Sequence, residues 1–235
     1  MPLFLDSGLH DDFLAPKPVL RQSATEPLLL WVGQLEPLKC LPLALEALAQ
    51  IRTYSFHLLV AGKGSMRKEW QDLVDRLGLR SRVTFLGQIP HCKMPGLYRS
   101  ADVFVFTSLR DSFGSQVLEA MGAGLPIVAL DHQGVGSFMP ADAGIRVPVS
   151  SPGETVQALA GALRRLLASA GLRNRMGRVS WEFARNQTWA QRVAVMRQLY
   201  EEIVGGRHPL QLRTREEVKT VVPPSQVSGQ PALRR

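Results

Sequence analysis

T-S-L-R-D-S-F-G-S-Q-V-L-E-A-M-G-A-G-L-P, residues 107–126, is the stretch of the sequence that decides the fold. It follows residues 103–106, a short run of β-branched and aromatic residues that is typical of a buried parallel strand. Gly114 begins a segment with apolar residues at helical spacing, and Gly122 and Gly124 end it. The stretch therefore predicts a strand, a tight polar loop and the N-terminus of a helix, in that order.

Two carboxylates flank this turn, Asp111 in the loop and Glu119 inside the expected helix. The residues between them, Ser112, Phe113, Gly114 and Ser115, should present unpaired backbone N–H groups, which favour an anion or sugar hydroxyls. A buried carboxylate can also accept two hydrogen bonds from a vicinal diol. The alternative is that the helix dipole favours acidic residues here and that they bind nothing.

The spacing Asp111-x7-Glu119, with Phe113-Gly114 inside it and E-A-M-x-A-G-x-P at 119–126, resembles retaining glycosyltransferases of the GT-B fold, family 4 (group 1). That family usually has Glu at both ends of the spacing, and Asp111 is one methylene shorter. The resemblance covers residues 28–203 and implies the C-terminal, donor-binding half of a GT-B fold.

Apolar runs and helical stripes alternate along the chain. Six strands are expected, at 28–32, 56–61, 82–86, 103–106, 127–130 and 144–149. Helices are expected between them, and three more at 154–167, 172–185 and 190–204. This alternation predicts an α/β fold with a doubly wound parallel sheet, Rossmann-like, with right-handed crossovers.

Punctuation by Pro and Gly suggests three segments: a linker at 1–27, a folded domain at 28–204, and a disordered basic tail at 205–235. The resemblance implies that the domain at 28–204 binds a nucleotide sugar. The resemblance places an acceptor-binding half before the linker, and we expect that half to be missing. The chain has 235 residues, 45% of them hydrophobic, and a net charge of +8. Because the tail alone has six Lys or Arg and two Glu, a nucleic-acid footprint on the folded body is not expected.

Cys40 and Cys92 have no metal-binding or redox spacing, which indicates a reducing compartment. No run is long enough to span a membrane, and no signal peptide is recognisable, so a cytoplasmic protein is expected. The sequence leaves membrane contact undecided. No cluster of metal ligands is visible, and neither a metal nor another cofactor is expected.

The loop after the first strand should lie at the carboxyl edge of the sheet, where α/β proteins bind ligands. The resemblance directs Gly33, Gln34 and Lys39 at a nucleotide diphosphate, although Gln34 stands where the family usually has Arg. The alternative for Lys39 is a solvated lysine before a helix. Cys40 is expected to be a buried small apolar residue rather than a nucleophile.

Later loops add further candidates. The resemblance seats the nucleotide base on Gln88 and Ile89, and brings a glycine-rich loop with His132 and Gly134 near the sugar or diphosphate. The sequence leaves open whether His132 is an acid or base or caps the strand end. Gly62-Lys63-Gly64 is interpreted as a tight exit from a strand, and His91 as the first residue of a helix.

The resemblance implies that a hexose is transferred, with retention, from a nucleotide-diphospho-sugar such as a UDP- or GDP-sugar. Lys39, Asp111 and Glu119 would be catalytic: Lys39 would stabilise the departing diphosphate, Asp111 would orient the sugar, and Glu119 would hold the ribose. The expected donor-binding residues are Gly33, Gln34, Lys39, Gln88, Ile89, Asp111, Ser112, Phe113, Gly114, Ser115, Leu118 and Glu119.

Three alternatives remain. The chain could be a non-catalytic nucleotide-sugar-binding module, or a subunit completed by a separate acceptor-binding chain. A dehydrogenase-type Rossmann domain is the weakest alternative, because two glycines without a third make an incomplete fingerprint.

Overall fold

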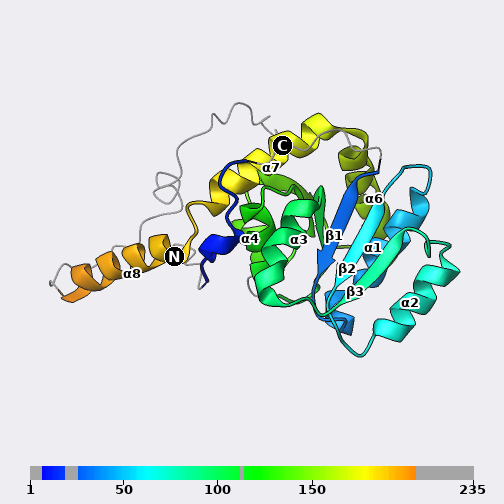
Figure 1. The fold of residues 1–235 in the computed structure, drawn as a ribbon, viewed down its shortest axis with the longest axis horizontal. Coiled ribbons are helices and arrows are strands. Elements are labelled where there is room, and N and C mark those ends of the chain that lie inside the picture. Colours follow the sequence, from blue (N-terminus) through cyan, green and yellow to red (C-terminus); the bar gives the residue numbers. More distant parts are fainter. Residues whose placement is uncertain (1–6, 19–25, 112–113, 205–235) are drawn as a thin grey trace, which may run out of the picture. The chain divides into compact units, whose positions relative to one another are not determined.

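The structure is a computed structural model that describes residues 7–18, 26–111 and 114–204, with the side chain of residue 133 also left out (Figure 1). Contacts divide the chain into a body, Ser7–Arg192, and a second unit whose described residues are 193–204. The predicted domain end at 204 differs from this division, and the tail predicted at 205–235 lies outside the described residues.

The body is built on one parallel sheet in the order β3-β2-β1-β4-β5-β6. Its strands are β1 (Leu28–Val32), β2 (His57–Ala61), β3 (Val83–Gly87), β4 (Val103–Phe106), β5 (Ile127–Leu130) and β6 (Gly144–Val147). The predicted doubly wound fold is therefore confirmed. The order reverses at β1, which pairs with β2 on one side and β4 on the other.

Helices cover both faces of the sheet (Figure 1). One face carries α1 (Leu41–Gln50), α2 (Arg67–Arg76) and α6 (Pro152–Ala168). The other carries α3 (Met94–Ser100), α4 (Ser115–Gly122) and α7 (Ala170–Ala184). The short α5 (Gln133–Phe138) and the 3-10 turns η1 (Asp11–Phe13), η2 (Pro37–Lys39) and η4 (Ala141–Ala143) were not predicted, since they are too short to show a periodic apolar stripe. The 3-10 turn η3 (His91–Lys93) begins at the residue where a helix start was predicted.

Alternate strand residues fill the two layers of the core. Leu29 and Trp31 belong to the apolar cluster under α1 and α6. Phe104 faces the other layer, where its ring centroid lies 5.7 Å from that of Tyr98 on α3. Each large side chain buried in this way contributes about 1.5–3 kcal/mol, so both layers stabilise the central strands.

Part of the predicted linker is packed on the body. Leu9 and Phe13 are buried, and Leu9 exchanges two backbone hydrogen bonds with Gln187 and Trp189. At Gly122 of α4 a Cβ would come within 2.9 Å of the Phe13 carbonyl oxygen, so glycine permits the close approach. The sequence did not reveal this docking because two isolated apolar residues have no period.

The last helix, α8 (Trp189–Val204), has no buried residue. Trp189, at the start of this helix, has 48% of its surface exposed. Large apolar side chains are also exposed farther along the helix, at Val193, Val195, Leu199, Tyr200, Ile203 and Val204. Among the described residues, no helix is long and apolar enough to cross a bilayer.

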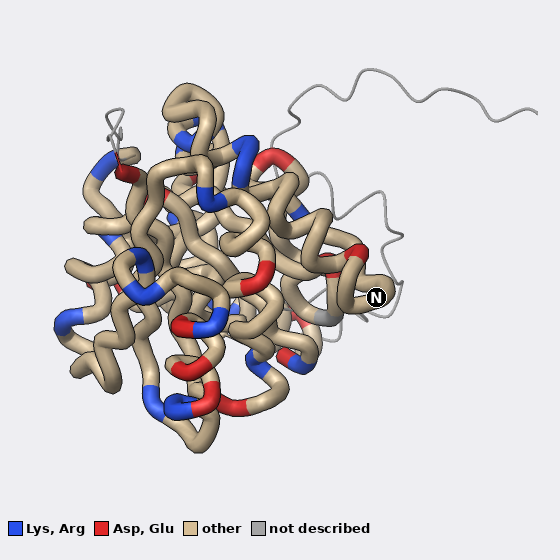
Figure 2. The backbone as a smooth tube through the Cα atoms, turned by 90° about the vertical axis from the view of Figure 1, so that its right-hand side faces the viewer, with Lys and Arg blue, Asp and Glu red and all other residues tan. Residues whose placement is uncertain are grey.

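Figure 2 shows basic and acidic residues interspersed on the side of the molecule that it presents. The net positive charge is therefore not gathered into one band on this side, and no large field of one sign covers it.

Candidate functional site

A cleft of about 560 Å³ opens at the carboxyl ends of β1, β2 and β3. It lies beside the point where the strand order reverses, which is where open α/β sheets leave a crevice for ligands. Its lining consists of Val32, Gly33, Gln34, Glu36, Ala61, Gly62, Lys63, Gly64, Gln88, Ile89, Met94 and Gln116.

The floor of the cleft is formed by two loops that touch through their backbones. Gly62 has φ +147°, and a Cβ there would lie 1.8 Å from the Gly33 carbonyl oxygen. The Gly33 N–H donates to the Ala61 carbonyl at 3.1 Å, and the Leu35 N–H donates to that of Lys63 at 2.9 Å. The interpretation of Gly62-Lys63-Gly64 as a tight strand exit is confirmed.

Four of the expected donor-binding residues, Gly33, Gln34, Gln88 and Ile89, line this cleft together. The structure adds polar side chains that the sequence analysis missed: Glu36, Lys63 and Gln116. Glu36 accepts hydrogen bonds from the N–H and hydroxyl of Ser65, which ties the two loops together. Two of these residues could have been noticed in the sequence. Lys63 lies between two glycines, and Gln116 precedes Glu119 by one turn of the expected helix.

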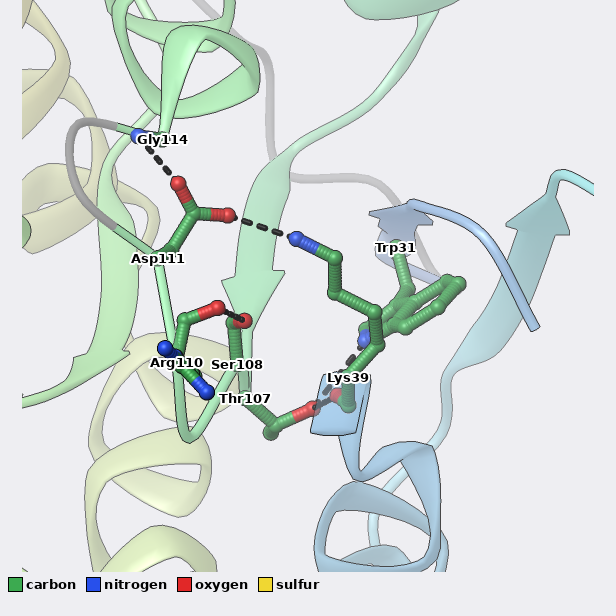
Figure 3. A network of polar contacts seen from close by, with 7 residues as sticks. All are labelled: Trp31, Lys39, Thr107, Ser108, Arg110, Asp111 and Gly114. Atoms are coloured by element: carbon green, nitrogen blue, oxygen red, sulfur yellow. Dashed lines mark hydrogen bonds and ion pairs between the residues drawn. The ribbon is translucent and has the colours of Figure 1, made fainter. Parts of the chain in front are cut away.

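Lys39 and Asp111 form an ion pair, with 2.6 Å between Nζ and Oδ2 (Figure 3). Both side chains are largely shielded, with 20% and 17% of their surfaces exposed. Neither residue belongs to the lining of the cleft. The lysine expected to meet a phosphate is therefore neutralised by the carboxylate expected to meet a sugar.

The loops that carry this pair are joined at three more points. Trp31 donates from Nε1 to the Thr107 hydroxyl at 3.1 Å, and that hydroxyl donates to the Lys39 carbonyl at 2.9 Å. The Leu109 N–H donates to the Leu38 carbonyl at 2.8 Å. The first loop and the loop after β4 are thus held as one unit (Figure 3).

Gly114 was expected to present a free N–H group, and this expectation is wrong. Its N–H donates to Oδ1 of Asp111 at 2.7 Å, because the loop folds back so that the carboxylate caps its own turn. Gly114 itself has φ +70°, which glycine adopts at little cost. Ser112 and Phe113 lie outside the described residues.

The other predicted residues around α4 and α5 are spread over different environments. Ser115 begins α4 and is exposed, whereas Leu118 is fully buried, so its side chain is part of the core. Gly134 donates its N–H to the Asp111 carbonyl at 3.4 Å. His132 is exposed and forms no side-chain capping hydrogen bond at the start of α5, so its role as an acid or base stays a prediction.

Glu119 lies in the seam between α3 and α4, where the Tyr98 hydroxyl donates to its Oε2 at 2.8 Å. Burial raises the pKa of Glu119, while the hydrogen bond from Tyr98 and the nearby charge of His91 act in the opposite direction. Burial and the adjacent carboxylate raise the pKa of Tyr98 well above its ordinary value. The phenol therefore remains a hydrogen-bond donor at neutral pH.

His91 is the first residue of η3, as expected, and its exposed ring lies 5.0 Å from that of Phe13. Cys40 is half-buried, and burial raises the pKa of its thiol, which disfavours a nucleophilic thiolate. Cys40 also has φ +46°, a left-handed conformation that glycine adopts more easily. Within the described ranges, no group of three or more His, Cys, Asp or Glu could hold a metal ion.

Residues 15–180 match the family described as glycosyl transferases group 1. The chain belongs to this family. Two relatives of this group 1 glycosyl transferase illustrate the similarity. D-inositol 3-phosphate glycosyltransferase of Corynebacterium glutamicum is 28% identical over 187 residues, which cover 76% of this chain and 44% of that protein. Alpha-D-kanosaminyltransferase of Streptomyces kanamyceticus is 33% identical over 153 residues, covering 64% and 39%.

Solved structures agree with the family. Sucrose-phosphate synthase from Thermosynechococcus elongatus superposes with a TM-score of 0.71 and 28% identity, covering 85% of this chain and 52% of that one. HepE of Anabaena, in complex with UDP-glucose, gives a TM-score of 0.65 and 25% identity, covering 78% and 50%. This group 1 glycosyl transferase therefore spans about half, or less, of the relatives it matches.

Proposed function

We propose that this chain is the donor-binding, C-terminal half of a retaining hexosyltransferase of family 4, and that it binds a nucleotide-diphospho-sugar. The observation that carries the proposal is the cleft at the carboxyl edge of β1–β3, which brings Gly33, Gln34, Gln88 and Ile89 together. They come from two loops 54 positions apart in a chain of the group 1 family. The binding of UDP-glucose by HepE, a structural neighbour, supports the same ligand class.

The arrangement of the cleft supports one orientation of the ligand. The base would lie against Gln88 and Ile89, and the ribose near Glu119, which sits on α4 one turn beyond the lining residue Gln116. The diphosphate would meet the Gly33–Gln34 backbone, where Lys63 adds an exposed positive charge. The hexose would then reach the Asp111 loop.

Transfer requires stabilisation of the negative charge that develops on the departing diphosphate. Lys39 is proposed to supply the positive charge that stabilises the departing diphosphate. Its ammonium group becomes available when its ion pair with Asp111, at 2.6 Å, is released or shared. Asp111 would then accept hydrogen bonds from the hexose hydroxyls. No metal or other cofactor is invoked, since these side chains supply the charge.

We further propose that the acceptor is bound by a second domain or a separate chain. Relatives and neighbours are about twice as long as the matched region. The exposed apolar residues of α8, among them Val193, Leu199 and Tyr200, support a protein partner because a contiguous apolar surface is unfavourable in water. We also propose that the protein is cytoplasmic.

Calorimetric titration of the chain with UDP, UDP-glucose, GDP and GDP-mannose tests donor binding. Gln34→Glu places a negative charge in the cleft and should weaken the preferred nucleotide about tenfold. Gln71→Glu, an exposed position outside the cleft, makes the same charge change and should leave binding unaltered. No binding of any of the four ligands at millimolar concentration would overturn the proposal.

A second candidate is a nucleotide-sugar-binding module that does not transfer sugar. It is favoured by Gln34, which contributes no charge to the cleft, and by the pairing of Lys39 with Asp111. A coupled assay for nucleotide release separates the two candidates only when an acceptor-binding half is supplied, because the transferase should then turn over and the binding module should not. For the chain alone we expect binding without appreciable turnover, and a rate of about one per second or faster would contradict this expectation.

A further inference from the structure

Two pairs of side chains face each other across the seam between α3 and α4. Met94 and Tyr98 are four residues apart on α3, and Gln116 and Glu119 are three apart on α4, so each pair shares a helix face. Met94 and Gln116 line the cleft. Tyr98 and Glu119 are joined by the 2.8 Å hydrogen bond one turn farther along each helix.

The position of the Tyr98 hydroxyl is fixed by its surroundings. The side chain is fully buried, and its ring centroid lies 5.9 Å from that of Phe13 and 5.7 Å from that of Phe104. A phenol packed in this way has few rotamers, and a buried hydroxyl requires a hydrogen-bond partner. Oε2 of Glu119 is the partner observed.

The other carboxylate oxygen of Glu119, Oε1, accepts no hydrogen bond from any residue within the described ranges 7–18, 26–111 and 114–204. It is also not among the fully buried, unpartnered polar atoms of these residues. The carboxylate is therefore fixed through one oxygen, while the other remains available to a ligand.

We propose that Tyr98 is a positioning residue of the donor site, which holds the Glu119 carboxylate by Oε2 so that Oε1 accepts a hydrogen bond from a ribose hydroxyl. The inference rests on the proposed function, since the ribose belongs to the proposed nucleotide. Glu119 would then accept a hydrogen bond from the diol through Oε1 alone rather than through both oxygens, because Oε2 already accepts one from Tyr98.

The surroundings of Glu119 determine how binding depends on pH. Tyr98 and, from η3, His91 are the groups that lower its pKa against the effect of burial. Two other charged groups on neighbouring elements form hydrogen bonds to backbone carbonyls. Arg99 donates to the Asp12 carbonyl, and the buried Arg173 of α7 donates to the Leu166 and Leu167 carbonyls. The remaining charged side chains on these elements are exposed to solvent: Asp11, Asp12, Lys93, Arg175, Arg178, Glu182 and Arg185. The strands β4 and β5 carry no titratable side chain.

Tyr98→Phe keeps the ring and removes only the donor. The pKa of Glu119 should rise further, because the hydrogen bond that favours its ionised form is lost. Nucleotide binding that needs the carboxylate is present above this pKa and is lost as the pH falls through it. The loss should therefore begin at a higher pH in Tyr98→Phe, and the affinity for UDP at neutral pH should fall about threefold to tenfold.

The test is calorimetric titration with UDP and with inorganic pyrophosphate across the acid range, on wild type, Tyr98→Phe, Glu119→Gln and the double variant. Pyrophosphate has no ribose, so its affinity should not respond to Tyr98→Phe. In the Glu119→Gln background, Tyr98→Phe should cause no further loss of UDP affinity. Tyr54→Phe, a half-buried tyrosine packed against the cluster on the other face of the sheet, is the matched control.

The outcomes separate the two proposals. If wild type binds none of UDP, UDP-glucose, GDP and GDP-mannose, the proposed function fails, and the inference fails with it. If Glu119→Gln weakens UDP but Tyr98→Phe leaves both affinity and pH profile unchanged, only the positioning role is overturned. Equal weakening of UDP and pyrophosphate by Tyr98→Phe, or weakening that persists without Glu119, would show a merely structural role and also overturn it.

Discussion

Replacing Asp111 by Asn removes the charge that holds Lys39 and keeps a side chain of nearly the same size. The Asn carbonyl oxygen can still accept the hydrogen bond that the Gly114 N–H now donates at 2.7 Å, so the loop should keep its turn. Lys39 loses its charged partner at 2.6 Å and becomes available to an anion. The expected result is tighter binding of a bare nucleoside diphosphate.

The magnitude follows from the shielding of the pair, since only 20% and 17% of the two side chains are exposed. A hydrogen bond between charged groups contributes about 1.5–3 kcal/mol. If binding of a diphosphate replaces roughly half of this interaction, removing the competitor should strengthen UDP binding by about 0.8–1.5 kcal/mol, or about fourfold to twelvefold. The free energy of unfolding should fall by about 1.5–3 kcal/mol, because the same pair stabilises the folded protein.

Calorimetry with UDP at constant ionic strength measures this effect on Asp111→Asn, Lys39→Met and the double variant. The gain in UDP affinity caused by Asp111→Asn should vanish in the Lys39→Met background, because the carboxylate acts through that lysine. Asp75→Asn, which breaks the exposed pair with Arg80 and changes the net charge equally, should not alter UDP binding. UDP-glucose should gain less than UDP, since Asp111 is proposed to hold the hexose.

Two results would refute this reasoning. Weaker UDP binding by Asp111→Asn would mean that the carboxylate helps the diphosphate rather than competing with it. An equal gain in the Lys39→Met background would mean that the ion pair is irrelevant to the ligand.

Three other substitutions follow from the structure. Gln34→Arg should tighten UDP binding about tenfold by calorimetry, because a guanidinium in the cleft can bind phosphate oxygens in a bidentate way, and unchanged affinity would count against the placement of the diphosphate. Cys40→Gly should raise the free energy of unfolding by about 1 kcal/mol in urea denaturation, since φ +46° strains any residue with a Cβ; a decrease would show that the side-chain packing outweighs the strain. Arg173→Leu should lower the free energy of unfolding by about 2 kcal/mol, because the carbonyls of Leu166 and Leu167 lose their buried charged donor, and a neutral result would show that water replaces it.

The sheet could be predicted because its strands are buried on both faces. Such strands are continuous apolar runs, and β1, β4 and β5 begin and end at the residues predicted from these runs. The last strand ends two residues earlier than expected, at Val147, where the chain turns toward the Ser151 cap of α6. Helices were found where an apolar stripe was long enough to reveal its period.

The site was predicted only in part, since its key contacts join residues that are distant in the chain. The resemblance pointed to Lys39 and Asp111 separately, yet nothing in the sequence shows that two residues 72 positions apart would pair with each other. The partner of Glu119 was equally hidden, because Tyr98 looks like any aromatic residue on a buried helix face. Packing of the loops and helices decides these contacts, and a one-dimensional pattern does not contain it.

The contacts of Trp31 have an optical consequence. Its indole N–H bonds to Thr107, which bonds in turn to the Lys39 carbonyl, and its ring also lies against Gly33 at the edge of the cleft. The emission of a buried indole depends on its local field and hydrogen bonding. Trp31 is therefore an intrinsic fluorophore that is connected by hydrogen bonds to the loop expected to meet the phosphates. Its fluorescence can follow the movement of Lys39 without a label.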